Sequence, residues 1–350
     1  MKQKQTLKNI FHKTPISWNV TSPADNQGIS TRILSKKGSV FRYNVEFSDG
    51  TKTTFIGKRK SAIILAKGAK MLAEHNIPLF LAICMRNKTF GFQKGWKREA
   101  YIYQKMPKKL RKHLPLLYGA DIRPLGKTGF LAMEEFSFST PVSKENIYQI
   151  IDGILPIHNH FFNQPNAVKD LCINRFSAKD YKKEKRILKK IFDHLGDNVL
   201  SILGEKKVQT IHRFADRLDE EAKQVSFHQT LTHNDFSNRN IAVTPKKVIF
   251  YDWELATFQN PEHDIVELVL SVMDDMSPEE IKNVFTYHKE HLPIAISEET
   301  YRKLLRFNLL EFCIIKLSLI RGADIRLQLN YANRIAKNIA TLMDLLNIEK

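Results

Sequence analysis

The chain has 350 residues, of which 43% are hydrophobic and 26% are charged, so its composition fits a globular protein and excludes a disordered one. Its three cysteines, Cys84, Cys172 and Cys313, lie far apart without the spacing of metal ligands, so we expect neither a zinc site nor a disulfide framework. Residues 1–134 contain 26 Lys and Arg against 7 Asp and Glu, whereas residues 135–350 contain 29 against 30. The excess positive charge in the first part could bind polyphosphates or nucleic acid, or could form a solvated surface.

No apolar run of signal-peptide length follows the N-terminus. The most apolar late stretch, Phe307 to Ile320, is interrupted by Glu311 and Lys316 and is too short to span a bilayer. We therefore expect a cytoplasmic protein that does not enter a membrane.

The first 30 residues are mixed and polar, and we expect an extension with little regular structure there. Alternation from Val40 to Phe47, the turn Ser48-Asp49-Gly50 and a return strand from Thr51 to Lys58 predict a hairpin, because Asp-Gly supplies the positive φ of a tight turn. Helical spacing predicts helices over 61–76 and 95–106, and two further strands are predicted over 116–122 and 129–133.

After residue 136 the pattern becomes helical. Ser143 is a predicted cap of a helix with isoleucines on one face, and the chain from Glu298 to Leu346 has the pattern of two packed helices. The sequence therefore predicts an α+β protein with three parts. These are an N-terminal extension (1–30), a small β-rich lobe (31–136) and a larger helical lobe (137–350).

Three polar side chains form the most informative pattern. Asp235 and Asn240 lie five residues apart in a polar loop, and Asp252 follows an apolar strand at 248–251. A hairpin around residues 245–247 would bring Asn240 and Asp252 together. Carboxylate and amide oxygens suit Mg²⁺, and a third carboxylate nearby can orient an attacking hydroxyl. The alternative is that these side chains only cap turns.

This pattern, His-x-Asp-x-x-x-x-Asn followed by Asp a dozen residues later, resembles the catalytic and metal-binding loops of the kinase superfamily. The segment Tyr251-Asp252-Trp253-Glu254, and Asp264 after a Pro-containing turn, are similar to the aminoglycoside phosphotransferase and choline kinase-like family in particular. The resemblance implies that Asp235 is the catalytic residue, that Asn240 and Asp252 hold the metal, and that His233 and Asp264 support the catalytic loop.

The family resemblance also implies a bilobal protein kinase-like fold, with a small N-lobe and a larger helical C-lobe. It implies a small-molecule kinase that uses Mg²⁺ and transfers the γ-phosphate of ATP or GTP to a hydroxyl group. In this reading, Lys58 contacts the phosphates and Glu99 is its helix partner, while Arg59 and Lys60 compete with Lys58 for that role. Arg239 could contact a phosphate or form a surface pair.

Other nucleotide contacts follow from the resemblance. The loop at 35–39 has a single glycine, so Ser39 and backbone amides would serve where other kinases use a glycine-rich loop. Residues 131–136 resemble the hinge between the lobes, where Glu134, Glu135 and Phe136 would meet the adenine edge.

The acceptor is left open by the sequence. Acidic pairs at 274–275, 279–280 and 298–299 would suit a cationic amino sugar or amino alcohol, or they are solvated helix ends. Sugars, antibiotics and nucleoside-like acceptors also fit.

Two other functions compete with a small-molecule kinase. An atypical protein kinase is disfavoured, because only eleven residues separate Asp252 from Asp264 and leave no room for a long activation segment. A non-catalytic kinase-like protein that binds nucleotides or RNA is the alternative from a different class, and Asp235, Asn240 and Asp252 together argue against it.

Overall fold

The structure is a computed structural model of the chain. It describes residues 2–21, 40–61, 94–123, 128–135, 140–175, 177–193, 195–327 and 330–348. Residues 62–76 of the helix predicted over 61–76 lie outside these residues, as do Ser39 and Phe136, whereas Ser61 is the last residue of a strand.

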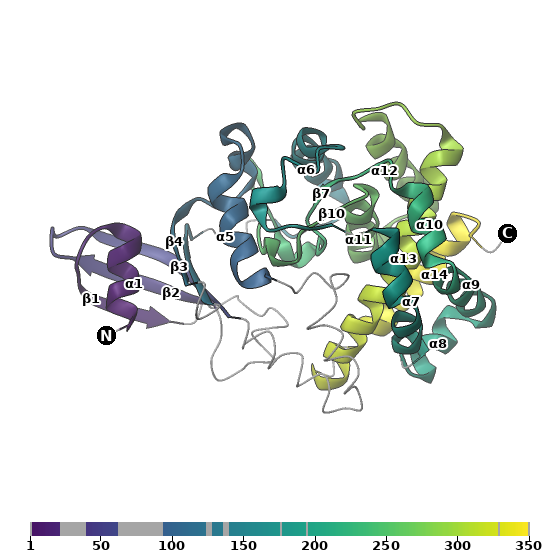
Figure 1. Ribbon diagram of the computed structural model, residues 1–350, viewed down its shortest axis with the longest axis horizontal. Helices are drawn as coiled ribbons and strands as arrows, with labels where there is room; N and C mark the ends of the chain where they lie inside the picture. The colour runs from purple at the N-terminus through teal and green to yellow at the C-terminus, as the bar shows by residue number, and fades with distance from the viewer. Residues whose placement is uncertain are drawn as a thin grey trace.

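A five-stranded antiparallel sheet forms the N-terminal lobe at one end of the molecule (Figure 1). In spatial order the strands are β1 (Pro15–Thr21), β2 (Val40–Phe47), β3 (Lys52–Ser61), β5 (Thr128–Met133) and β4 (Leu117–Arg123). The predicted hairpin of β2 and β3 is present, with Gly50 at φ 79° in its turn. Gly57 on β3 is required by packing, since a Cβ there would lie 2.3 Å from the Tyr43 ring.

Residues 2–21 differ from the predicted unstructured extension. They form helix α1 (Lys2–Phe11) and then β1, which pairs with β2. Leu7 and Ile10 of α1 are buried against the sheet. A Cβ at Gly119 of β4 would lie 2.8 Å from Ile10 Cγ2, so the glycine allows the helix to approach the strand. Leu7, Ile10 and Phe11 have the spacing of one helix face, which is the signal that the polar composition of this segment hides.

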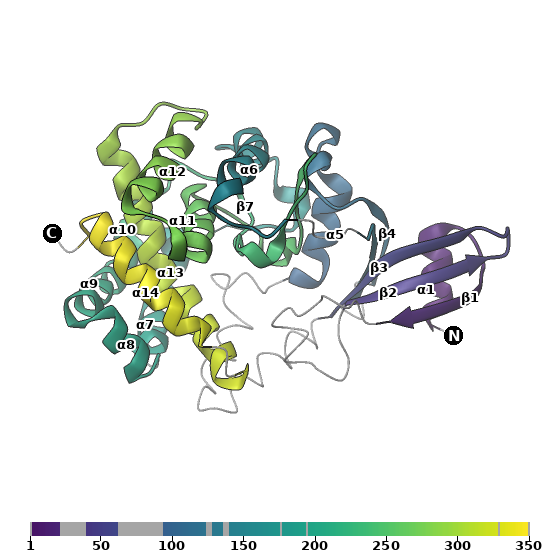
Figure 2. The ribbon, with the colours of Figure 1, turned by 180° about the vertical axis from the view of Figure 1, so that it is seen from behind.

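Helix α5 (Gly95–Lys105) lies between the sheet and the C-terminal lobe (Figures 1 and 2). Ala100 and Ile102 of this helix, and Met106 directly after it, are fully buried. They belong to the large hydrophobic core of the C-terminal lobe. The helix is followed by the 3₁₀ helix η1 (Lys108–His113). Because α5 packs into the larger lobe, a side chain on it can reach both lobes.

The C-terminal lobe is mainly helical and lies at the other end of the long axis (Figure 1). Its helices are α6 (Ile147–Phe161), α7 (Ala178–Asp193), α8 (Asp197–Leu203), α9 (Glu205–Asp216), α10 (Leu218–Val225), α11 (Glu262–Val272), α12 (Pro278–Glu290), α13 (Glu298–Leu327) and α14 (Tyr331–Leu345). Short 3₁₀ helices accompany them, namely η2 (Lys144–Asn146), η3 (Lys169–Leu171), η4 (Asn238–Asn240), η5 (Trp253–Leu255) and η6 (Met273–Asp275). The predicted α+β fold with a small β-rich lobe and a larger helical lobe is confirmed. None of the described helices combines the length and the apolar character needed to cross a bilayer.

Short strands carry the polar loops of the C-terminal lobe. β7 (Thr230–Thr232) pairs with β10 (Thr257–Gln259), which is parallel to β6 (Asn174–Arg175). β8 (Ile241–Val243) and β9 (Val248–Phe250) form the hairpin predicted around residues 245–247. All residues of β7, β8, β9 and β10 are buried, so the loops between them are held on a rigid base.

Candidate active site

The loop between β7 and β8 is fixed by a buried carboxylate on α11. Asp264 Oδ2 accepts a hydrogen bond of 2.8 Å from the His233 amide, and Oδ1 accepts one of 3.0 Å from the Asn234 amide. His158 Nε2 lies 3.0 Å from Asp264 Oδ2. Burial opposes the charge on this carboxyl, but the hydrogen bond from His158 and the nearby histidine charges lower its pKa. The structure therefore brings Asp264 into contact with the backbone of His233 and Asn234, in the loop before Asp235.

Further anchors hold the same loop. Glu267 Oε2 accepts a hydrogen bond of 2.9 Å from the Phe236 amide. Lys316 of α13 donates to the Asn234 carbonyl, and Asn234 has a left-handed φ of 58°, which Asn tolerates better than most residues. The His233 ring contacts the Tyr251 carbonyl at 2.9 Å. Asp235 therefore lies between residues whose backbone groups are fixed from two helices, α11 and α13.

Asp235 and Asn240 are joined directly. Asn240 Nδ2 donates to the carbonyl oxygen and to the Oδ2 atom of Asp235, each at 2.8 Å. Across the hairpin the Tyr251 amide donates to the Asn240 carbonyl at 3.1 Å, and Asp252 follows with a left-handed φ of 66°. The three oxygen-bearing side chains predicted to share a site thus lie on adjoining loops.

Two lysines from β3 converge on Asp252. Lys58 Nζ lies 2.9 Å from both carboxylate oxygens of Glu99 and 2.7 Å from Asp252 Oδ1. Lys60 Nζ lies 3.3 Å from Asp252 Oδ1 and 3.6 Å from Glu99 Oε2, and it also bonds Glu254. Residues two apart on a strand share a face, so both lysines point into the cluster.

Arg59, the third candidate, lies on the opposite face of β3. Its Nη2 atom lies 3.4 Å from the Tyr43 hydroxyl, and its guanidinium stacks 5.9 Å from the Phe41 ring centroid. The structure thus separates Arg59 from the cluster and leaves Lys58 and Lys60 together in it.

Charge is nearly balanced in this buried cluster. Burial disfavours the Lys60 cation, but Asp252, Glu254 and Glu99 raise its pKa well above 10.5. Burial also opposes the Asp252 carboxylate, while Lys58 and Lys60 lower its pKa. Burial raises the pKa of Glu254 despite the opposing effect of Lys60. The Asp252 carboxyl is therefore ionised, and its Oδ1 atom contacts both ammonium groups.

The hydroxyl of Tyr103 and the guanidinium of Arg98 complete the cluster, and sequence reasoning missed both. The Tyr103 hydroxyl donates to Glu99 Oε1 at 2.9 Å and accepts from the Asp252 amide at 3.1 Å. Arg98 donates to the backbone carbonyls of Cys172, at 3.1 Å, and Glu254. Tyr103 lies one helical turn after Glu99, a spacing that could have identified it.

Of the expected hinge residues, the structure describes Glu134 and Glu135. The Glu134 amide donates to the Leu116 carbonyl at 2.8 Å, so it is already used. Glu135 forms an exposed ion pair of 3.0 Å with Arg42. Ser39 and Phe136 lie outside the described residues. A contact of Glu134 and Glu135 with adenine stays a prediction, and for Glu134 it would use the carbonyl.

Asn240 and Asp252 fit a magnesium ion by the chemistry of their donors. Both offer hard oxygen atoms, and the Asp252 pKa is lowered, so its carboxylate is charged. The described part of the chain contains no cluster of three or more His, Cys, Asp or Glu side chains suited to a metal. A site with few protein ligands, completed by phosphate oxygens, is the type that magnesium commonly uses.

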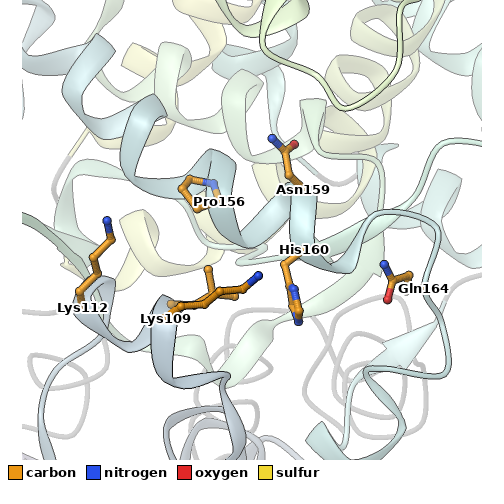
Figure 3. Close-up of a pocket in the computed structure, with 7 residues that line it drawn as sticks. Lys109, Lys112, Pro156, Asn159, His160 and Gln164 are labelled. Atoms are coloured by element: carbon orange, nitrogen blue, oxygen red, sulfur yellow. The ribbon is translucent and has the colours of Figure 1, made fainter.

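A separate cavity of about 490 Å³ lies between η1 and α6 (Figure 3). The side chains labelled there are Lys109, Lys112, Pro156, Asn159, His160 and Gln164. None of the predicted site residues lines it. The cavity is therefore distinct from the Lys58–Asp252 cluster.

Part of the chain matches a known protein family. Residues 179–295 match the model of the phosphotransferase enzyme family, APH. No curated protein sequence matches the chain significantly.

Solved structures resemble the chain over nearly its whole length. The choline kinase LicA from Streptococcus pneumoniae has a TM-score of 0.51 at 13% identity, covering 97% of this chain and 100% of LicA. The aminoglycoside phosphotransferase APH(4)-Ia, in a ternary complex with ADP and hygromycin B, has a TM-score of 0.50 at 10% identity over 97% and 98%. The spectinomycin phosphotransferase APH(9)-Ia, bound to AMP, has a TM-score of 0.50 at 13% identity over 99% and 97%. The chain thus has the fold of these small-molecule kinases, and its residues 179–295 carry the signature of the phosphotransferase enzyme family.

Proposed function

We propose that the chain is a kinase that transfers the γ-phosphate of ATP to a hydroxyl group of a small molecule. The family match and the fold support a small-molecule phosphotransferase. The single observation that carries the proposal is the buried cluster in which Lys58 bonds both Glu99 and Asp252. It joins a cationic strand of the N-lobe to the acidic loop beside Asp235.

The phosphates of the nucleotide would lie against Lys58, which Glu99 holds in place. Asn240 and Asp252 would hold magnesium, which would neutralise phosphate charge when bound. The described pairing of Lys58 and Lys60 with Asp252 shows that this loop already faces the N-lobe cations. Positioning and charge neutralisation are the main sources of catalysis in phosphoryl transfer.

Asp235 would accept a hydrogen bond from the acceptor hydroxyl. The hydroxyl oxygen then forms a bond to the γ-phosphorus as the bond to the β-phosphate oxygen breaks. ADP leaves, and the hydroxyl proton passes to Asp235 and on to solvent. The hydrogen bonds from Asn240 Nδ2 to Asp235 keep this carboxylate oriented before the acceptor binds.

Adenine is the proposed base. Several of the similar structures contain AMP or ADP, among them those of LicA, the spectinomycin phosphotransferase and APH(4)-Ia. GTP is the competing donor, and a direct comparison of the two triphosphates decides between them.

A protein kinase is less well supported. The residues between Asp252 and Asp264 are used by η5 and β10, with β10 paired to both β6 and β7. A long activation segment therefore has no place in this interval.

The test is a screen of hydroxyl acceptors with ATP and with GTP, read as release of the nucleoside diphosphate. Acceptor-dependent release that Asp235→Asn abolishes supports the proposal. Tight nucleotide-independent binding of RNA, with steep salt dependence and no diphosphate release, would favour the kinase-like binding protein instead.

A further inference from the structure

The catalytic loop carries a cation that stacks on the C-terminal helix. Arg239 lies four residues after Asp235, and its Cζ atom is 5.4 Å from the centroid of the Tyr331 ring. Tyr331 is the first residue of α14. Arg334, one turn later, places its Cζ atom 5.2 Å from the same ring. Two guanidinium groups from different elements therefore share one aromatic ring beside the catalytic loop.

This ring lies near the proposed catalytic carboxylate. Burial raises the pKa of the Tyr331 hydroxyl, Arg239 and Arg334 lower it, and the negative charges of Glu267 and Asp235 raise it further. The ring is half-buried, whereas both arginines are exposed. Arg239 and Arg334 therefore present two exposed guanidinium groups on a ring that senses the charge of Asp235.

The two arginines differ in the partners of their guanidinium groups. Arg334 Nε lies 3.3 Å from Asp274 Oδ2, and its Nη2 donates to the Ser271 carbonyl at 2.9 Å. Arg239 Nε lies 3.5 Å from Ser237 Oγ, and no carboxylate of the described chain forms an ion pair with Arg239. The donor groups of Arg239 are therefore available to a ligand oxyanion.

The acidic pairs that could favour a cationic acceptor are used elsewhere. Asp274 pairs with Arg334 and accepts from Asn338. Glu280 belongs to the capping box at the start of α12, and Glu298 in the first turn of α13 pairs with Lys289 at 2.7 Å. All three pairs lie at helix ends, so they do not form an acidic wall opposite Asp235.

A third positive charge lies behind the loop. Lys316 is 6% exposed and donates to the Asn234 carbonyl, next to Asp235. In a buried site a charge acts over a longer range than in water. Lys316 and Arg239 thus bring positive charge to the segment that carries Asp235, while the carboxylates of Asp264 and Glu267 hold its backbone amides.

We propose that the acceptor is a hydroxyl compound that carries an oxyanion, a phosphate or a carboxylate, and that Arg239, aided by Arg334, binds this group. The inference rests on the proposed phosphotransferase function and names its substrate class. A guanidinium offers two parallel donors that match an oxyanion. Stacking on Tyr331 holds both guanidinium planes in place before the ligand arrives. Arg239 is then a specificity residue, while Asp235 orients the hydroxyl.

The experiment measures binding to the full chain saturated with ADP and magnesium, by titration calorimetry. The probes are matched sets: glycerol, glycerol 3-phosphate, glycerate and serinol; glucose, glucose 6-phosphate, gluconate and glucosamine; and inorganic phosphate alone. We expect the anionic members to bind, and Arg239→Gln to weaken them tenfold or more. The matched control is Arg302→Gln, an exposed arginine on α13 about 21 Å along the helix from Lys316. It should change these affinities less than twofold.

Preference for phosphate over carboxylate members, or the reverse, identifies the oxyanion. Better binding of the neutral or amine members overturns the proposal. So does anion binding that Arg239→Gln leaves unchanged, or the absence of binding by every anionic probe. The phosphotransferase function fails by a different result, the loss of ADP binding or of diphosphate release with every acceptor. Because anion binding is scored as an affinity, the two failures are distinguishable.

Discussion

Lys58 Nζ lies 2.7 Å from Asp252 Oδ1, which joins the strand β3 of the N-terminal lobe to the loop after β9 in the C-terminal lobe. Lys58 is buried, the Asp252 side chain is 26% exposed, and Glu99 bonds the same ammonium. A cation shared by two carboxylates is held firmly only while the lobes stay together. The contact therefore couples the lobe arrangement to the geometry of the proposed phosphate site.

Lys58→Met is expected to lower kcat by about 10²- to 10³-fold, the usual loss when one charge-stabilising group is removed from an active site. It also leaves Glu99 and Asp252 with one cation fewer. Arg59→Met is the matched control, because Arg59 is the next residue on the strand but stacks on Phe41 on the opposite face. It should retain turnover within about threefold. Steady-state ADP release checks both, and a greater loss in Arg59→Met would contradict the assignment of Lys58.

Lys60→Met is also expected to lower kcat, and its effect on kcat should not add to that of Lys58→Met. Both ammonium groups contact Asp252 and Glu99, and groups with shared partners are generally non-additive. The double variant should therefore lose less, in logarithmic terms, than the sum of the single losses. A strictly additive result in ADP-release kinetics would show that the two lysines act at separate places.

The sequence predicted the part of this site that spacing and resemblance determine. Asp235, Asn240 and Asp252 lie on adjoining loops, and Lys58 meets Glu99, because each lies at a fixed position of a strand, helix or hairpin. The pairing of Lys60 with Asp252 joins residues 192 apart in sequence, so only the folded chain shows it. Strand alternation implied that Lys58 and Lys60 share a face, yet the resemblance called for a single lysine.

At two other positions the sequence did not indicate what the structure shows. The polar first 30 residues concealed α1 and β1, because three apolar side chains on one face are enough when a sheet covers them. Lys316 interrupts an apolar run, and in the sequence it indicates only that this run does not span a membrane. A charge inside a buried helix needs a partner, and the partner here is the backbone of the catalytic loop.

Asp235→Asn is expected to retain ADP affinity within about threefold and to lower kcat by roughly 10²- to 10⁴-fold, the range for loss of a general base. The amide keeps the shape of the side chain, and Asn240 can still donate to the Asp235 backbone carbonyl. Calorimetry with ADP and single-turnover transfer separate the two effects. Near-normal transfer would falsify the proposed role.

Asp264→Asn is expected to destabilise the fold by about 1–3 kcal/mol, because one amide oxygen cannot satisfy the backbone amides of both His233 and Asn234. Urea unfolding measures this change. The control is Asp216→Asn, an exposed carboxylate paired with Lys189 at 2.6 Å, which should cost less than about 1 kcal/mol. Equal losses in the two variants would show that Asp264 does not anchor the loop.

The same residue predicts a pH dependence. The Asp264 pKa is lower in the folded state than its ordinary value of 3.8. Its contribution to stability is therefore complete above that ordinary value and is lost as the pH falls through the folded pKa. The wild-type chain should lose more unfolding free energy than Asp264→Asn between pH 5 and pH 2. Parallel curves for the two proteins would contradict the lowered pKa.

His288 predicts a loss of stability in milder acid. The residue is fully buried, with Nδ1 2.9 Å from the Tyr301 hydroxyl, and burial, together with His158 and His228, lowers its pKa well below 6.5. Below pH 6.5 this histidine binds a proton in the unfolded chain but stays neutral in the folded chain. The free energy of unfolding therefore decreases as the pH decreases. His288→Gln should flatten the unfolding curve between pH 6.5 and pH 5. The control is His212→Gln, at a partly exposed histidine. It should keep the wild-type dependence of unfolding free energy on pH.

Tyr103→Phe tests whether the hydroxyl between α5 and the metal loop supports the chemistry. The hydroxyl donates to Glu99 at 2.9 Å and accepts from the Asp252 amide at 3.1 Å, so its removal leaves a buried amide without its partner and one fewer bond on Glu99. We expect a loss of about 1–3 kcal/mol in unfolding free energy. We also expect the KM for ATP to rise more than kcat falls, because Glu99 positions Lys58 against the phosphates. Tyr101→Phe is the matched control, since Tyr101 contacts Lys97 and Lys105 by cation–π stacking, which phenylalanine retains. An unchanged KM for ATP in Tyr103→Phe would show that the Tyr103 hydroxyl does not support nucleotide binding through Glu99.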